Sequence, residues 1–475
     1  METSPLIVDV KKMAPEGEAI AFPMASNEGQ AKQSSRVIFI AGAVPGDRLE
    51  VELVSAKSSF ARARIKRLLT PGPDRIQPPC PLHDAPGRPT PACGGCNWQQ
   101  LAYETQLKHK REMIRDCLGR IAKMREAAVE PVLASPQAWG YRNKVQIPFG
   151  LDKTGKIIAG FYASSSHQIV DFNACPVQPE LSVRIALKVK ELAVKLRWPI
   201  YDAQSNRGWL RHLFVRTNSQ GKALAALVTH SPMFLRHEEF ISEMREAFPE
   251  IVSFYQNVQP LKTSVILGES WRRLWGACGL EEKIGRFTFF ASPGVFLQVN
   301  TEAAALLYDA ALAALKDGGP AGSHAPAAAF DLILDLYCGV GTLACWLAQA
   351  ATRMIGVEEN PQAVRDAWAN AERNKIKNAR FYAGKVESLL PKLKKELPAR
   401  CAAVVDPPRS GLSEPVLRLL TERSISRVVY VSCNPATFAR DVGYLSKSGF
   451  KLGRVQPVDL FPQTSHIELV AQLNT

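Results

Sequence analysis

The chain has 475 residues, of which 46% are hydrophobic and 22% charged, and its formal net charge is +14. This length predicts about two to four domains. The apolar run over 301–315 is too short and too charged to span a bilayer, and no basic start with an apolar core marks a signal peptide. We therefore expect a cytoplasmic protein without a membrane partner, whose basic charge favours a polyanion such as RNA.

Short alternating segments fill the first 70 residues. The stretch "SRVIFIAGAVPGDRLEVELVSAKSSFARARIKRLL" places Gly and Pro turns between strand-like pieces. This pattern predicts a small OB-like β-barrel over residues 1–70. Its last piece is strongly basic and could present positive charge to RNA, although a solvated strand edge would have the same composition.

A central, mainly β domain is expected over residues 71–285. It begins with a Pro- and Gly-rich loop, residues 70–96, which is long enough to need something that holds it. A helical period covers residues 97–125, and we expect this helix to pack on the C-terminal domain. Strand patterns then run from about residue 131 to 284, interrupted by one helix over 183–196.

The sequence changes character after residue 285. A helix over 301–315 and a Gly/Pro/Ala-rich connection over 316–329 precede alternating strands and helices. The strand-like pieces are "FDLILDLY", "RMIGVEE", "ARFYAG", "AAVVDPP", "RVVYVSC", "KLGRVQPVDLF" and "HIELVAQL". This alternation predicts a Rossmann-like α/β domain with a mostly parallel sheet over residues 286–475.

A cofactor pocket is predicted where the first of these strands ends. "DLYCGVGTL" runs from Asp335 into a helix, and Glu358 ends the next strand, where an acidic side chain can bind ribose hydroxyls. A dinucleotide would call for a third glycine and would be repelled by Asp335. S-adenosylmethionine (SAM), which is cationic and has no phosphate, fits the loop better. Asp406, in "DPPR" after a later strand, should reach the same crevice.

Cys433 ends the strand "YVSCNPA". Free cysteine is most often a buried packing residue. Here, however, neighbouring strands bring Asp406 and Cys433 to one crevice, and Glu468 begins the last strand. A thiolate that adds to C6 of uracil makes C5 nucleophilic enough to take a methyl group, and a carboxylate can then remove the C5 proton.

These motifs carry a family resemblance. "DLYCGVGTL", "DPPR", "VSCNP" and "HIELV", with "FLQVN" upstream, resemble the bacterial RNA uracil-C5 methyltransferases over nearly the whole chain. The resemblance implies a TRAM barrel, a central β domain with a cysteine cluster and a class I SAM-dependent methyltransferase domain. It assigns Cys433 as nucleophile and Glu468 as base. It assigns the SAM contacts to Gln298, Tyr337, Thr342, Glu358 and Asp406; the family often has Asn in place of this Thr.

Four cysteines form the second candidate site: Cys80, Cys93, Cys96 and Cys175. Four thiolates can bind zinc or an iron-sulfur cluster, and the resemblance favours a [4Fe-4S] cluster. The C-x12-C spacing at its start is longer than in the family, which leaves His83 as an alternative to Cys80. We expect the remaining cysteines to be buried packing residues: Cys117, Cys278, Cys338, Cys345 and Cys401.

The resemblance thus implies methylation of a uridine, and 23S ribosomal RNA is the favoured substrate. We expect the protein to be a monomer. The preference for 23S RNA rests on the barrel, which the transfer RNA (tRNA) enzymes generally lack. Three alternatives stay open: a tRNA uridine methyltransferase, an exocyclic-amine methyltransferase that uses "DPP" without a nucleophile, and a cluster-bearing RNA-binding factor without catalysis.

Overall fold

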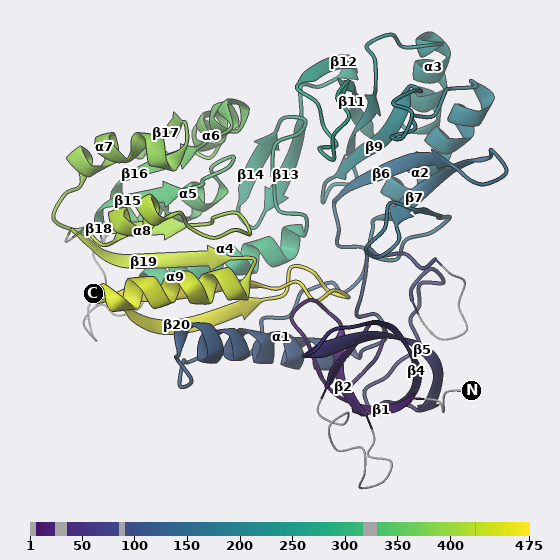
Figure 1. The fold of residues 1–475 in the computed structure, drawn as a ribbon. Coiled ribbons are helices and arrows are strands. Elements are labelled where there is room, and N and C mark those ends of the chain that lie inside the picture. Colours follow the sequence, from purple (N-terminus) through teal and green to yellow (C-terminus); the bar gives the residue numbers. More distant parts are fainter. Residues whose placement is uncertain (1–5, 24–35, 85–90, 317–329, 423) are drawn as a thin grey trace, which may run out of the picture.

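The chain is multidomain, with a small barrel, a central sheet and a C-terminal sheet (Figure 1). The computed structural model describes residues 6–23, 36–84, 91–316, 330–422 and 424–475. The connection predicted after residue 316 lies outside them. No helix in these ranges is long and apolar enough to cross a membrane.

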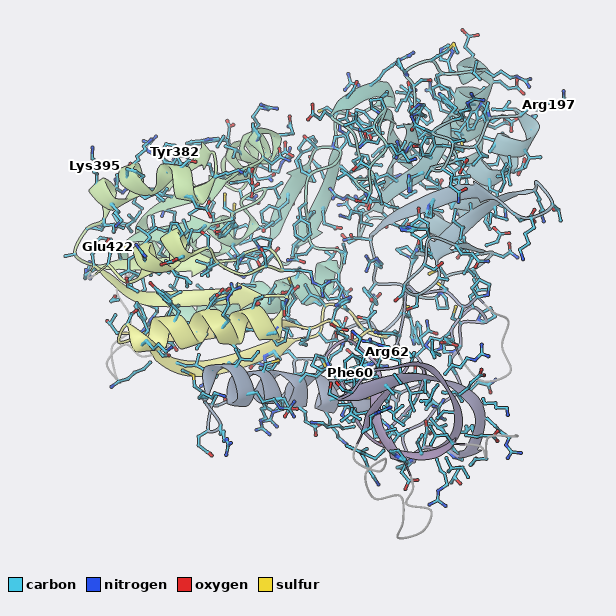
Figure 2. All side chains as sticks on the ribbon, viewed as in Figure 1. Phe60, Arg62, Arg197, Tyr382, Lys395 and Glu422 are labelled. Carbon is cyan, nitrogen blue, oxygen red and sulfur yellow. The ribbon has the colours of Figure 1, made fainter. Side chains whose placement is uncertain are left out.

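The N-terminal part is a closed five-stranded barrel with the order β1-β2-β3-β5-β4. Its strands are β1 (Leu6–Met13), β2 (Ala19–Pro23), β3 (Val37–Ile40), β4 (Arg48–Ala56) and β5 (Phe60–Thr70). Alternation turns Val8 and Leu49 into the barrel core. Figure 2 labels Phe60 and Arg62 on β5, where the Arg62 guanidinium lies 5.6 Å from the Phe60 ring centroid.

The central part is a seven-stranded sheet with the order β12-β11-β10-β9-β6-β7-β8. Its strands are β6 (Lys144–Leu151), β7 (Ile157–Tyr162), β8 (Ile169–Asp171), β9 (Leu210–Thr217), β10 (Ala223–Thr229), β11 (Ile251–Val258) and β12 (Ser270–Gly276). Two helices accompany it, α2 (Glu180–Lys195) and α3 (His237–Ala247). The sequence predicts only the first. Phe240 and Met244, four residues apart, bury one face of α3 in the core of this sheet.

A short hairpin connects the central and C-terminal parts. Strands β13 (Leu280–Ile284) and β14 (Phe287–Ala291) pair with each other, and the predicted domain boundary falls in their turn. The hairpin is fastened to the C-terminal part, because the Asn370 and Asn374 side chains accept hydrogen bonds from the backbone N–H groups of Phe290 and Thr288.

The C-terminal sheet has the order β17-β16-β15-β18-β19-β21-β20, with β21 antiparallel to both of its neighbours. Its strands are β15 (Phe330–Leu336), β16 (Ala351–Glu358), β17 (Ala379–Ala383), β18 (Cys401–Val405), β19 (Ile425–Ser432), β20 (Lys451–Val458) and β21 (Glu468–Asn474). The accompanying helices are α4 (Thr301–Lys316), α5 (Thr342–Leu347), α6 (Pro361–Arg373), α7 (Val386–Glu396), α8 (Glu414–Leu420) and α9 (Pro435–Lys447). Residues of α4, α5 and α6 contribute to one core cluster, and those of α7, α8 and α9 to another.

Helix α1 (Tyr103–Cys117) and the π-helical turn Leu118–Ala122 join the barrel to the C-terminal sheet (Figure 1). Met113 packs into the barrel core, whereas Ile114 belongs to the core of the C-terminal sheet. The Lys110 ammonium donates to Asp459 Oδ1 at 2.7 Å and to the Phe461 carbonyl at 3.1 Å. This helix therefore holds the start of the loop that leads to Glu468.

We expect the Lys110→Met variant to be destabilised by about 3–5 kcal/mol, because it leaves Asp459 buried without its cation. Both side chains of this pair are fully buried. Urea unfolding followed by tryptophan fluorescence measures the effect. The Lys110→Met/Asp459→Leu double variant should recover much of the loss, and exposed Lys108→Met should change stability by less than about 0.5 kcal/mol. Equal losses at Lys108 and Lys110 would contradict the assignment.

Candidate active site

Three acidic residues stand at the carboxyl edge of the C-terminal sheet. Asp335 lies in β15, Glu358 ends β16, and Asp406 follows β18. The strand order reverses between β15 and β18, which is where open α/β sheets bind ligands. Glu358 is fixed by backbone donors, since its carboxylate accepts from Gly339 N–H at 3.1 Å and from Asn360 N–H at 2.8 Å.

The loop after β15 has an unusual backbone. Tyr337 has a φ of 70°, which is strained for a residue with a side chain, and such strain is concentrated at ligand sites. Gly341 has a φ of 79°, and a Cβ there would lie 3.1 Å from the Ala367 Cβ. Thr342 then begins α5, and its hydroxyl group forms a hydrogen bond with the phenol group of Tyr308. The loop thus brings its backbone close to the carboxylates.

Burial gives these carboxyl groups a high proton affinity. It raises the pKa of Asp335 to about 8, with a further contribution from Asp406, and raises that of Asp406 to about 7. Two buried acids side by side favour a positively charged ligand, because a cation between them lowers both pKa values. This is the electrostatic environment that a sulfonium group requires.

Cys433 follows β19 directly, and Glu468 begins β21. The two strands pair with Ser432 opposite Leu469, so both side chains stand at the same end of the sheet. Asn434 and Pro435 end the strand and begin α9, where the Asn434 side chain caps the helix by accepting from the Ala436 N–H. Cys433, Glu468 and Gln298 all line one cavity of about 570 Å³.

Burial makes both the thiol and the carboxyl group hold their protons more tightly. Burial raises the pKa of Cys433 to about 12, with Glu468 and Asp406 adding to the effect. Burial and Asp406 also raise the pKa of Glu468 well above its usual value. The Arg409 guanidinium lowers the pKa of both groups, so it is the cation that favours their reactive, unprotonated forms.

All four predicted cluster cysteines line the same cavity, as does His83. The Cys93–Cys96 loop is pinned to the end of β7, because Gly94 N–H donates to the Tyr162 carbonyl at 2.9 Å. Backbone N–H groups point at the sulfurs: Gly95 donates to Cys93, and Val177 and Gln178 donate to Cys175. Burial and neighbouring thiols raise the pKa of Cys175 to about 11 and that of Cys96 to about 12.

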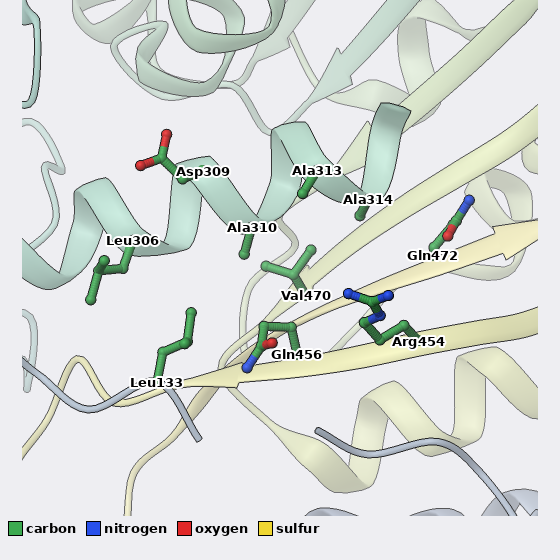
Figure 3. Close-up of a pocket in the computed structure, with 10 residues that line it drawn as sticks. All are labelled: Leu133, Leu306, Asp309, Ala310, Ala313, Ala314, Arg454, Gln456, Val470 and Gln472. Atoms are coloured by element: carbon green, nitrogen blue, oxygen red, sulfur yellow. The ribbon is translucent and has the colours of Figure 1, made fainter. Parts of the chain in front are cut away.

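The predicted site residues thus fall into two groups. Cys433, Glu468, Gln298 and the four cysteines share the cavity, whereas Tyr337, Thr342, Glu358 and Asp406 are absent from its lining. Asp406 connects the groups, because its charge acts on both Asp335 and Glu468. A smaller cavity of about 260 Å³ lies between α4 and β20–β21 and contains none of the predicted residues (Figure 3).

Several lining residues were not predicted from the sequence: Arg142, Lys144, Phe296 and His466. The alternation in "YRNKVQIPF" could have revealed the first two, since every second residue is polar at its start. One cysteine prediction is wrong. Cys278 is exposed, because it lies in the turn between β12 and β13, whereas the other four expected packing cysteines are buried.

Comparison with known proteins agrees with this geometry. Residues 296–474 match the tRNA (uracil-5-)-methyltransferase family. The chain is 37% identical to an uncharacterized RNA methyltransferase of Halalkalibacterium halodurans, with 94% of this chain and 93% of the relative covered. It is 38% identical to one of Gloeobacter violaceus, with 96% and 97% covered.

A solved tRNA methyltransferase is similar to this chain over nearly its whole length. It is the Pyrococcus abyssi tRNA (uracil-54, C5)-methyltransferase in complex with S-adenosyl-L-homocysteine, with a TM-score of 0.72 and 26% identity over 98% of this chain and 99% of that one. The strand order, the acidic carboxyl edge and these matches lead to one conclusion. The chain belongs to the tRNA (uracil-5-)-methyltransferase family and is a SAM-dependent RNA methyltransferase.

Proposed function

We propose that this enzyme methylates C5 of a uridine in RNA through a covalent bond between Cys433 and C6 of the base. The observation that carries the proposal is the cavity in which Cys433 and Glu468 stand side by side, next to the acidic edge formed by Asp335, Glu358 and Asp406. A target base must leave its stack to reach such a cavity.

The residues present fit SAM, which supplies an electrophilic methyl group when bound. We propose that Glu358 holds its ribose, because two backbone N–H groups fix that carboxylate. Gln298, Tyr337 and Thr342 complete the predicted contacts, and Asp406 faces the cationic end. A positive charge there would lower the pKa of Glu468 as well, which would favour the unprotonated form of the base.

The chemistry then divides between two side chains. The Cys433 thiol loses its proton to solvent, and the thiolate adds to C6, which places negative charge on C5 and O4 of the ring. The ring takes the methyl group at C5. Glu468 removes the C5 proton, the C5–C6 double bond reforms and the Cys433 thiolate leaves, which returns the nucleophile.

Release of the C5 hydrogen tests this proposal against an exocyclic-amine methyltransferase. RNA carrying tritium at C5 of uridine should release tritium into water in step with methyl transfer. An amine methyltransferase would transfer methyl groups without release, and a non-catalytic binding factor would do neither. Methyl transfer with all tritium retained would therefore overturn the proposal.

The RNA substrate is 23S ribosomal RNA or tRNA. The sequence favours 23S RNA because of its barrel, which we propose to be a TRAM domain. The barrel does not exclude tRNA as the substrate, because the tRNA enzyme of Pyrococcus abyssi matches 98% of the present chain, barrel included. Mapping 5-methyluridine in both RNAs from a deletion strain decides between them, and loss of the modification from one RNA alone identifies the target.

We further propose that the four cysteines hold a [4Fe-4S] cluster. They converge on one cavity, and N–H groups face their sulfurs, which is typical of iron-sulfur sites. In the described ranges, no three His, Cys, Asp or Glu side chains lie close enough to hold a single metal ion.

Replacing Cys175 by Ser should remove the cluster. We expect anaerobically purified wild-type protein to contain about four irons per chain and to absorb near 400 nm, and the variant to lose most of both. Cys278→Ser, on an exposed turn, is the matched control and should keep its iron. Zinc without iron in the wild type would contradict the cluster assignment.

Activity should rise with pH. The pKa of Cys433 is raised to about 12 and that of Glu468 is raised as well, and both groups must be unprotonated to react. The reactive fraction therefore increases from pH 6 towards pH 9, and single-turnover methyl transfer should follow it. Arg409→Met should shift the rise to higher pH, because it removes the cation that lowers both pKa values. A rate that is flat over this range would contradict the assignment.

A further inference from the structure

Two basic side chains of the cavity wall have no role in the reaction described so far. Arg142 and Lys144 line the cavity together with Gln146 and Pro148, and the intervening Val145 also reaches the lining. The alternate residues Val145, Ile147 and Phe149 are buried in the core of the central sheet. Strand β6 therefore presents one polar, basic face to the space in front of Cys433.

Neither cation is neutralised by the protein. Within the described residues, the side chains of Arg142 and Lys144 form no ion pair or hydrogen bond. The Lys144 ammonium lies 5.6 Å from the Phe296 ring centroid. Burial, Arg216 and Arg142 lower its pKa to about 8, so it lies among like charges. An anion that entered this space would relieve the repulsion and keep Lys144 protonated.

The cavity offers these cations no acidic partner at neutral pH. Glu468 is the one carboxyl group among its described lining residues, and burial raises the pKa of this carboxyl group, which disfavours its charged form. Arg409 adds a third positive side chain to the lining. Three cationic side chains therefore line the cavity that contains the nucleophile.

The basic strand of the barrel differs in this respect. Its charges are compensated by neighbouring strands: Arg62 pairs with Glu18, Arg64 with Glu52, and both Lys66 and Arg67 with Glu50. The many basic residues of this strand predict a positively charged surface. In the folded barrel, acidic residues of the neighbouring strands lie beside them and neutralise most of this charge. Among the described residues, Arg142 and Lys144 in the active-site cavity have no such ion pair.

We propose that Arg142 and Lys144 bind phosphate groups of the RNA chain beside the uridine that enters the cavity. This rests on the proposed function, in which RNA is the substrate. Phosphate contacts fix the position of a nucleic acid without reading its bases, so these residues hold the sugar-phosphate backbone while the base reaches Cys433. Desolvated cations form stronger charge-assisted bonds to phosphate than exposed ones do.

The competing role is to balance the charge of the cysteine thiolates. Both cations line the same cavity as Cys433, where RNA would enter, and the Arg142 charge lowers the pKa of His466, two residues from Glu468. If the competing role holds, loss of the cations should cost the protein its iron.

The test is the salt dependence of RNA binding. A fluorescein-labelled, uridine-rich single-stranded RNA of 16 nucleotides is titrated with iron-loaded enzyme and S-adenosylhomocysteine at 50–300 mM KCl. Each lost phosphate contact lowers the slope of log K against log salt by about 0.7. We expect Arg142→Gln/Lys144→Gln to lower the slope by about 1.4. Lys156→Gln removes an exposed lysine that lines no described cavity, so its slope should match the wild type.

The outcomes separate this inference from the proposed function. If the double variant keeps the wild-type slope, or loses its iron and its absorbance near 400 nm, the phosphate site is wrong. If the slope falls but the wild type methylates no uridine, the phosphate site stands and the proposed function fails. Unchanged binding of S-adenosylhomocysteine by calorimetry shows that the double variant is folded.

Discussion

Replacement of Cys433 by Ala should abolish methylation, with a loss of about 10³-fold or more, because no other group can add to C6 of the base. The same variant should bind SAM normally, since Cys433 is not among the predicted cofactor contacts. Single-turnover transfer of a labelled methyl group measures the first effect, and calorimetry measures the second.

A trapped adduct makes this expectation sharper. RNA with 5-fluorouridine at the target site has no C5 proton to remove, so the bond between protein and RNA should survive a denaturing gel in the wild type. Cys433→Ala should form no such adduct. Cys278→Ala changes another, exposed cysteine and should behave as the wild type. An adduct that persists in Cys433→Ala would exclude this residue as the nucleophile.

Replacement of Glu468 by Gln should stop the reaction one step later. The amide keeps the size of the side chain but cannot accept the C5 proton, so turnover should fall by about 10²–10⁴-fold. Methyl transfer precedes proton removal, and the variant should therefore accumulate a methylated covalent complex on ordinary uridine RNA. Gel electrophoresis followed by mass spectrometry of the digested complex detects it.

A second glutamate serves as the control for this variant. Glu422 is absent from the lining of the cavity and pairs with Lys394 at the surface, so Glu422→Gln should turn over normally. If Glu468→Gln turns over at the wild-type rate, another group must remove the proton. If it is inactive and forms no complex, the residue acts before methyl transfer rather than after it.

The sequence predicted the C-terminal sheet well, because its strands are continuous apolar runs separated by amphipathic helices. Residues at the ends of parallel strands must meet at one edge, so Asp335, Asp406 and Cys433 could be placed together from their positions in the chain. The motif order added Glu468. The strands of this sheet agree with the pattern to within a few residues at their ends.

Other features depend on contacts that a linear pattern does not contain. The basic strand of the barrel suggested a free RNA-binding surface, but only the register shows that Glu52 lies opposite Arg64. Helix α3 is short, and its apolar residues resemble those of the neighbouring strands. The cysteines and the nucleophile lie in one cavity although they come from positions 80–96, 175 and 433. No local sequence pattern indicates that such distant positions meet.

Helix α1 connects the barrel to the C-terminal sheet, and this connection limits where the chain can be cut into stable fragments. A fragment containing only residues 286–475 would hold the predicted nucleophile, base and cofactor contacts. It would lack Lys110, and with it the cation that neutralises Asp459 at the base of the Glu468 loop. It would also expose the apolar surface that Ile114 covers. We therefore expect that the C-terminal sheet does not fold stably without helix α1. A truncated or fused variant that replaces the central sheet should keep this helix.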